Sequence, residues 1–260
     1  SVDLFIGVDF NVFNFLLEGR LKQHGRRTVH YVSPSVYAWR RGRTKRVAKV
    51  ADVILCLFPF EPPFYAATPV EAVFVGHPLA DEISLDSGGA VGRSEARALL
   101  GVQVGKTVVA ILPGSRSGEL KLMLPPFLEA ARLIAEQESN VEFLIPYPRE
   151  TLKPILEVAL ADYPQLSVKL LPGAARTVLQ ASDAALVKSG TSTLEAMFLR
   201  RPMVVSYRMG TFSYQIAKRL MRSPYVALPN ILLNEMQVPE LLQYEGTPVK
   251  LAHALLTELR

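Results

Sequence analysis

Residues 107–119 read TVVAILPGSRSGE, which joins an apolar run to a turn of small residues. The run Thr107–Leu112 is rich in β-branched residues and does not alternate with polar ones, as is typical of a parallel strand buried on both faces. Beyond the turn, apolar residues recur at helical spacing through residues 121–138. This order predicts a strand, a tight turn and a helix in direct succession.

The same alternation extends in both directions along the chain. Strand-like runs are expected at residues 4–8, 28–32, 53–58, 72–75, 107–112, 141–145, 167–170, 184–187 and 203–206. Helix-like runs are expected at residues 94–100, 121–138, 151–160, 174–180, 193–199 and 213–222. Such alternation predicts right-handed βαβ crossovers and open, doubly wound sheets, so the fold class is α/β with Rossmann-like lobes.

Composition narrows the kinds of protein that this chain can be. Of its 260 residues 49% are hydrophobic and 20% are charged, which excludes a disordered chain. The net charge of +5 suits an anionic partner such as a phosphate, a nucleotide, a lipid surface or nucleic acid. The single cysteine, Cys56, excludes an internal disulfide framework, and the scattered histidines predict no zinc site. The longest apolar run, Val53 to Phe58, is far shorter than the roughly 20 residues of a membrane-spanning helix.

One segment interrupts the alternation of strands and helices. Residues 80–92, ADEISLDSGGAVG, are acidic and small and show no strong period, so we expect a linker there. We therefore predict a first lobe over residues 1–85 and a second lobe over residues 86–260, with the last helices packing back on the first lobe.

Two loops of the second lobe directly follow strand-like runs. They comprise Gly114, Ser115 and Arg116 after the run at residues 107–112, and Ser189, Gly190 and Thr191 after the run at residues 184–187. Ligands of open α/β sheets bind at the carboxyl ends of strands, where backbone N–H groups and helix N-termini attract anions. The fork of Arg116 suits a phosphate. Together the loops favour a nucleotide-diphosphate site over two plain turns.

Three further candidates each have a structural alternative. Glu195 stands one turn into the helix after the second loop and could accept the hydroxyls of a ribose, but Ser192 to Glu195 also fits a capping box. Asp9 ends the first strand-like run and is either a general base or the N-cap of the following helix. His77 ends another strand and is a candidate catalytic residue, although a lone histidine is more often structural.

A basic run follows the aromatic residues Tyr37 and Trp39. It reads RRGRTKR over residues 40–46 and includes Arg40, Arg41 and Arg43. A basic helix beside aromatic residues suits an anionic membrane surface or a phosphorylated lipid, and it also suits nucleic acid. The remaining alternative is a solvated helix face.

The motifs that carry a family resemblance occur in a fixed order. The string YVSPSVYAWR, residues 31–40, is similar to the signature of lipid-A-disaccharide synthase, a family 19 glycosyltransferase. Similar blocks lie at residues 5–9, 58–61, 74–77, 112–116, 189–195, 203–209, 228–230 and 239–243. They span almost the whole chain. Relative to the family, the chain lacks the N-terminal start and the C-terminal end, so we expect a piece of a longer protein with an incomplete first lobe.

The resemblance implies a two-lobed glycosyltransferase-B fold and a hexosyltransferase of lipid A, and hence lipopolysaccharide, biosynthesis. The implied reaction condenses UDP-2,3-diacylglucosamine with 2,3-diacylglucosamine 1-phosphate to give a β-1,6-linked disaccharide 1-phosphate and UDP, with inversion at the anomeric carbon. It implies no metal or other cofactor and no nucleic acid. Its substrates place the enzyme in the cytoplasm, peripherally associated with the inner membrane surface, and a homodimer is the implied assembly.

The resemblance also carries roles to individual residues. Asp9 becomes the base for the acceptor 6-hydroxyl, with His77 as a second catalytic candidate, and Trp39, Arg40, Arg41 and Arg43 become lipid-facing. The substrate-binding residues are Gly114, Ser115, Arg116, Ser189, Gly190, Thr191, Glu195, Tyr207 and Asn230. Where the family often has a second aspartate after Asp9, this chain has Val12 nearby, which argues against a mechanism with two carboxylates.

Other functions remain open from the residues alone. A UDP-N-acetylglucosamine epimerase or the peptidoglycan glycosyltransferase would share the two-lobed architecture. The epimerase would need further carboxylates and a histidine around the sugar, which the sequence does not locate. An inactive nucleotide- or lipid-binding fragment is the alternative from a different class.

Overall fold

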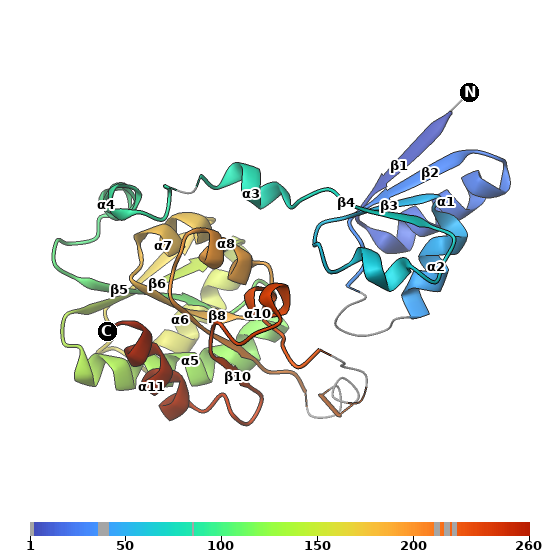
Figure 1. The fold of residues 1–260 in the computed structure, drawn as a ribbon. Helices are drawn as coiled ribbons and strands as arrows, with labels where there is room; N and C mark the ends of the chain where they lie inside the picture. Colours follow the sequence, from blue (N-terminus) through green and yellow to red (C-terminus); the bar gives the residue numbers. More distant parts are fainter. Residues whose placement is uncertain (1–2, 36–41, 85, 211–213, 216–218, 220–222) are drawn as a thin grey trace. The chain divides into compact units, whose positions relative to one another are not determined.

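The computed structural model describes residues 3–35, 42–84, 86–210, 214–215, 219 and 223–260. The chain divides into two compact units, the first formed by residues 1–80 and 212–224 and the second by residues 81–211 and 225–260 (Figure 1). Each unit contains a fully parallel sheet, which confirms the predicted α/β class.

The first unit is built on a four-stranded sheet of order β1-β2-β3-β4. The strands are β1 (Leu4–Val8), β2 (Arg27–Tyr31), β3 (Val53–Cys56) and β4 (Glu71–Phe74), and the helices are α1 (Asn11–Gln23), α2 (Gly42–Val50) and the 3₁₀ turn η1 (Pro62–Tyr65). Side chains of α1, α2 and η1 form the core with one face of the sheet, around Phe15, Val47, Ile54 and Tyr65. On β1 the alternate residues Leu4, Ile6 and Val8 are 47%, 53% and 60% exposed, because they lie on the other face.

A close approach between β1 and α1 accounts for a glycine. A Cβ on Gly7 would lie 2.1 Å from Glu18 Oε1, so a larger residue would force the strand and helix apart. Glu18 is fully buried, and its carboxylate is 2.7 Å from Nδ1 of the equally buried His30. The glycine therefore makes room for a buried polar pair between helix and sheet.

Glu61 is a second buried carboxylate in the first unit, just beyond the carboxyl end of β3. It is 2% exposed and accepts a hydrogen bond from the Phe58 N–H at 3.0 Å. Burial raises the pKa of Glu61 to about 7, although hydrogen bonds from the Phe58 N–H, Ser33 and the Leu57 N–H favour the ionised form.

The second unit is built on a six-stranded sheet of order β10-β9-β8-β5-β6-β7. Its strands are β5 (Thr107–Leu112), β6 (Val141–Tyr147), β7 (Val168–Pro172), β8 (Ala184–Lys188), β9 (Met203–Tyr207) and β10 (Glu240–Leu242). Its helices are α3 (Pro78–Glu82, at the boundary between the units), α4 (Ala90–Leu99), α5 (Ser117–Gln137), η2 (Glu150–Leu152), α6 (Lys153–Leu160), α7 (Ala175–Ala181), α8 (Ser192–Phe198), α10 (Leu228–Leu233) and α11 (Pro248–Glu258).

Helices cover both faces of this second sheet. Alternate residues of β5, Val109 and Ile111, belong to the core with α5, α6 and α11, while α4, α7 and α8 cover the opposite face (Figure 1). All the residues from Val108 to Leu112 are at most 6% exposed. The apolar run without alternation is thus explained by burial from two sides.

Two segments outside the central strands contribute to the packing of the second unit. The last helix, α11, packs on α5 and buries Leu251 and Leu255 in the core of this unit. The segment expected as a linker also packs on the second unit: Ile83 is 3% exposed, and a Cβ on Gly88 would lie 2.1 Å from the Leu199 carbonyl oxygen. Small residues permit close packing in this segment. Its lack of hydrophobic periodicity instead suggests a linker.

Within the described ranges, no helix combines the length and the apolar character needed to cross a bilayer.

Candidate active site

The two predicted anion loops lie side by side in the second unit. Strands β5 and β8 pair in parallel, with Leu112 opposite Val187, so the loops that follow them leave the same edge of the sheet together. From β5 the chain proceeds to β6 and β7 on one side, and it later returns to β8 on the other side. This is the topological switch point at which open α/β sheets bind ligands.

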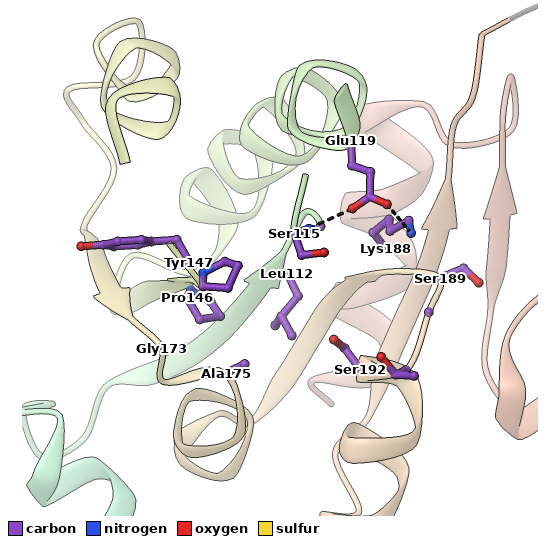
Figure 2. Close-up of a pocket in the computed structure, with 14 residues that line it drawn as sticks. Leu112, Ser115, Glu119, Pro146, Tyr147, Gly173, Ala175, Lys188, Ser189 and Ser192 are labelled. Carbon is purple, nitrogen blue, oxygen red and sulfur yellow. Dashed lines mark hydrogen bonds and ion pairs between the residues drawn. The ribbon is translucent and has the colours of Figure 1, made fainter. Parts of the chain in front are cut away.

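A cleft of about 270 Å³ opens between these loops (Figure 2). Its lining residues come from the carboxyl ends of four neighbouring strands: Leu112, Gly114, Ser115, Glu119, Pro146, Tyr147, Pro148, Gly173, Ala175, Lys188, Ser189, Gly190, Thr191 and Ser192. The structure thus brings together five of the predicted binding residues, Gly114, Ser115, Ser189, Gly190 and Thr191.

Glu119 organises the loop after β5. Glu119 lies in the first turn of α5, and its Oε2 accepts a hydrogen bond from the Ser115 N–H at 2.9 Å. Gly114 has φ of 123°, and a Cβ there would lie 2.6 Å from Glu119 Oε2. The glycine is therefore required by both its backbone conformation and the closeness of the carboxylate.

Lys188 brings a positive charge to the cleft from the end of β8. Its Nζ lies 3.1 Å from Glu119 Oε1 and 4.9 Å from the centre of the Tyr207 ring (Figure 2 for the ion pair). Burial opposes ionisation of Glu119, but the Ser115 N–H and the Lys188 ammonium together hold its pKa below the ordinary value. Burial, reinforced by the Glu119 carboxylate, raises the pKa of Tyr207.

Arg116 and Ser189 stand in different surroundings. The Arg116 side chain is 78% exposed and lies 3.2 Å from Glu119 Oε1, so its guanidinium is free to turn toward a ligand. Ser189 is 9% exposed, and its hydroxyl donates to the Val226 carbonyl at 3.1 Å. Arg116 thus shares the Glu119 carboxylate with Lys188, whereas Ser189 secures the second loop to the segment before α10.

Two predicted binding residues are engaged within the chain. Glu195 lies 3.7 Å from Arg176 on α7, and burial raises its pKa against the opposing effect of that arginine. The Asn230 side chain is fully buried; it donates to Val238 O and Glu240 Oε1 and accepts from the Gln237 and Val238 N–H groups. Asn230 therefore has no free donor or acceptor for a nucleotide, because its amide closes the turn before β10.

Several site residues escaped the sequence interpretation. Glu119 and Lys188 are 69 positions apart, and their ion pair depends on the adjacency of β5 and β8. Lys188 could have been identified from its place at a strand end, the criterion that selected Asp9. Glu240 accepts the Val226 and Ala227 N–H groups at 2.9 Å and so supports the segment that holds Ser189, but no motif indicated it.

The first unit places Asp9 directly after β1 in a strained turn. Asp9 and Phe10 both have positive φ, 44° and 40°, a conformation that costs non-glycine residues about 1–3 kcal/mol each. The N-cap position of α1 is Phe10, and the Asp9 carboxylate accepts a hydrogen bond from Asn11 Nδ2 at 3.2 Å. The alternative of Asp9 as the helix cap is therefore wrong. Its carboxylate is exposed.

His77 does not join Asp9. The strands that precede them, β4 and β1, are the outer strands of the first sheet, about 14 Å apart at the usual strand spacing. His77 Nδ1 accepts the Leu79 N–H at 3.1 Å, and its ring contacts Phe58. The geometry gives this histidine a place at the start of α3.

Of the four residues predicted to face lipid, the structure describes one, Arg43. Trp39, Arg40 and Arg41 lie outside the described residues, whereas Arg43 is exposed on α2 and lines a cleft that also contains Asp9. In the described part of the chain, no group of three or more His, Cys, Asp or Glu side chains is placed to hold a metal ion.

Comparison with known proteins gives matches over nearly the whole chain. A family model described as lipid-A-disaccharide synthetase matches residues 1–260. The lipid-A-disaccharide synthase of Burkholderia mallei (strain SAVP1) is 47% identical over 258 residues, covering 99% of this chain and 66% of that protein. The corresponding protein of Aromatoleum aromaticum is 45% identical over 255 residues, covering 97% of this chain and 64% of that protein.

Among solved structures, the fold is similar to that of the Methanocaldococcus jannaschii UDP-GlcNAc 2-epimerase in complex with UDP-GlcNAc and UDP. The TM-score is 0.65 at 15% sequence identity, with 99% of this chain and 69% of that chain covered. At 15% sequence identity this likeness shows a similar fold and nothing further. The present chain spans just under two thirds of the length of the relatives named above. The family match over all its residues, with the sequence identity to those relatives, shows that the chain belongs to the lipid-A-disaccharide synthetase family.

Proposed function

We propose that this chain carries the nucleotide-binding and acceptor-activating parts of an enzyme that joins two diacylglucosamine units. The donor is UDP-2,3-diacylglucosamine, the acceptor is 2,3-diacylglucosamine 1-phosphate, and the products are the disaccharide 1-phosphate and UDP. The observation that carries the proposal is the cleft between the β5 and β8 loops, with Lys188 at its wall and the Gly114–Ser115 turn at its mouth.

The second unit binds the UDP diphosphate. Lys188 and Arg116 both contact Glu119, so a diphosphate competes with this carboxylate for two cations that are already in position. Bond breaking leaves negative charge on the UDP oxygen, and fixed cations that strengthen their contacts as this charge develops lower the barrier. Lys188 contacts both the Tyr207 ring and the Glu119 carboxylate, which limits the reorganisation needed.

Asp9 of the first unit acts as the base. Its carboxylate takes the proton of the acceptor 6-hydroxyl while that oxygen attacks the anomeric carbon of the donor. The carbon–oxygen bond to the UDP diphosphate breaks at the same centre, which inverts its configuration. The exposed carboxylate and the strained backbone at Asp9 support this role, because strain of this kind concentrates at functional sites.

The lipid substrates place the reaction at the inner membrane surface, on its cytoplasmic side. The exposed apolar residues Phe10, Val12, Phe13 and Leu16 near the start of α1 support peripheral association, since exposed apolar groups insert at the lipid interface. Binding of the purified chain to vesicles of anionic lipid, measured by sedimentation, tests this part. Equal recovery in the supernatant with and without vesicles contradicts it.

The decisive experiment measures disaccharide 1-phosphate and UDP formation from the two diacylated substrates, beside calorimetric binding of UDP. Product formation supports the enzyme. Binding of UDP without product favours a nucleotide-binding fragment, the principal alternative.

A further inference from the structure

A second cleft, of about 540 Å³, lies within the first unit beside Asp9. It is bordered by the turn between β1 and α1 and by α2, and its polar lining consists of Asp9, Asn11, Arg43 and Arg46. Phe10 and Val12 supply apolar surface at its edge, where they are 70% and 73% exposed. One cleft thus holds a carboxylate, two guanidinium groups and an apolar rim.

The two arginines share one side of α2. They are three residues apart, which places them on the same helix face, while Val47 and Ala48 point into the core. Both arginines are exposed, and neither forms an ion pair with any residue that the structure describes. Asp9 is the one acidic residue among the described residues lining the cleft, and it is hydrogen-bonded to Asn11. The lining of the cleft therefore has a net positive charge, with two guanidinium groups and one carboxylate, and neither arginine is held in an ion pair with a described residue.

Resting on the proposed function, we propose that Arg43 and Arg46 bind the phosphate of the acceptor sugar while Asp9 faces its hydroxymethyl arm. A phosphate monoester carries up to two negative charges, and two planar guanidinium forks match its oxygens. In a glucosamine 1-phosphate the phosphate-bearing carbon and the carbon that carries the hydroxymethyl arm both flank the ring oxygen. One sugar can therefore present both groups to a single cleft.

Arginines on an exposed helix could instead meet phospholipid head groups. The shared location with Asp9 favours the sugar phosphate, because a head-group site has no need of a carboxylate beside the anion. Lys45 of the same helix is exposed but does not line the cleft. Its neutralisation provides a matched control, with the same charge change on the same element.

The test measures binding of glucosamine 1-phosphate to the full chain by calorimetry or ligand-observed NMR, with glucosamine as the probe that lacks phosphate. We expect glucosamine 1-phosphate to bind at least tenfold more tightly than glucosamine. Arg43→Gln and Arg46→Gln should each weaken its binding about tenfold, while Lys45→Gln changes it less than twofold. Circular dichroism and UDP affinity confirm that the variants are folded. No measurable binding by the wild type, or equal losses in all three variants, overturns the inference.

Two further measurements distinguish a sugar phosphate from a phospholipid head group, and distinguish failure of the arginine site from failure of the proposed function. If Arg43→Gln and Arg46→Gln reduce binding to phosphatidylglycerol vesicles but leave glucosamine 1-phosphate binding unchanged, the arginines meet head groups and the inference fails. If the chain forms the disaccharide and these variants leave the acceptor KM unchanged, the inference fails while the proposed function stands. If glucosamine 1-phosphate binding depends on both arginines but no disaccharide forms under any condition, the site stands and the proposed function fails.

Discussion

Two carboxylates, one in each unit, lie close to strand ends but have opposite pKa shifts. Glu61 of the first unit is buried with neutral hydrogen-bond donors, and burial raises its pKa to about 7. Glu119 of the second unit is also shielded from water, but Lys188 and the Ser115 N–H overcome the effect of burial and lower its pKa. The comparison teaches that the charge of a shielded carboxylate is decided by whether a cation shares its site.

The sheets differ in a related way. In the second unit the central strand β5 is covered on both faces, and its tip carries the cleft. In the first unit β1 is an outer strand with Leu4, Ile6 and Val8 about half exposed, and Asp9 follows it in a strained turn. The second unit therefore holds its cations on a buried framework, whereas the carboxylate of the first unit lies in a strained turn directly after a strand.

Substitution of Asp9 gives the strongest test of the proposal that the first unit supplies the base and the second unit binds UDP. Asp9→Asn removes the proposed base and should lower turnover by about 10²–10⁴-fold, the usual contribution of general base catalysis. UDP affinity should be unchanged, because the nucleotide cleft lies wholly within the second unit. Disaccharide formation and calorimetry with UDP check the two halves of this expectation. A turnover equal to wild type would leave the first unit without a catalytic carboxylate.

The raised pKa of Glu61 predicts a pH-dependent stability in the first unit. Between the unfolded pKa of 4.5 and the folded value of about 7, the native state binds the proton more tightly, so the free energy of unfolding falls as pH rises through this window. The full change is about 3 kcal/mol at 1.36 kcal/mol for each pKa unit. Urea unfolding at pH 5 and pH 8, followed by the fluorescence of the single tryptophan, Trp39, should show it. Glu61→Gln should abolish this pH dependence; an unchanged dependence would assign it to another group.

Lys188 should dominate UDP binding in the second unit. Lys188→Ala is expected to weaken UDP binding about tenfold to a hundredfold, since a charge-assisted hydrogen bond contributes roughly 1.5–3 kcal/mol. Arg116→Ala should have a smaller effect, because its guanidinium is 78% exposed and must be ordered on binding. Lys121→Ala, an exposed lysine of α5 that does not line the cleft, is the control. Calorimetry that gives equal losses for all three variants would indicate nonspecific attraction.

The lowered pKa of Glu119 predicts the smallest effect, with the opposite sign from Glu61. Its folded pKa lies below the unfolded value, so its contribution to stability is present above the unfolded pKa of 4.5 and is lost as pH falls through the folded pKa. The stability difference between wild type and Glu119→Gln should therefore be larger at pH 7 than at pH 3. Urea midpoints at both pH values measure it, and a constant difference would mean that Glu119 has no ionic partner in solution.

The parallel strands were largely predictable because a local pattern specifies them. The runs at residues 4–8 and 107–112 coincide with β1 and β5, since apolar, β-branched stretches bounded by turns are recognisable without knowledge of their partners. The pattern did not reveal that β1 leaves Leu4, Ile6 and Val8 exposed. Whether a strand is buried on one face or on both depends on which helices pack against the sheet. The alternation of strands and helices along the chain is the same in both cases.

The candidate site was predictable where it consists of backbone and small residues after strands, as at Gly114–Arg116 and residues 189–191. It was not predictable where it depends on side chains from distant elements. Asn230 shows this limit. Its motif predicted a residue that binds the nucleotide, but all the hydrogen bonds of its side-chain amide are made with Val238, Gln237 and Glu240.

The sequence by itself determined the α/β class and the two loops, because these depend on periodicity and local turn chemistry, and its ordered motifs indicated the family by their resemblance to known members. The tertiary structure alone decided that Lys188 meets Glu119, that Asn230 is closed to ligands, and that Arg43 and Arg46 share a cleft with Asp9. Strand order and helix docking bring these groups together, and neither is encoded in any single stretch of residues.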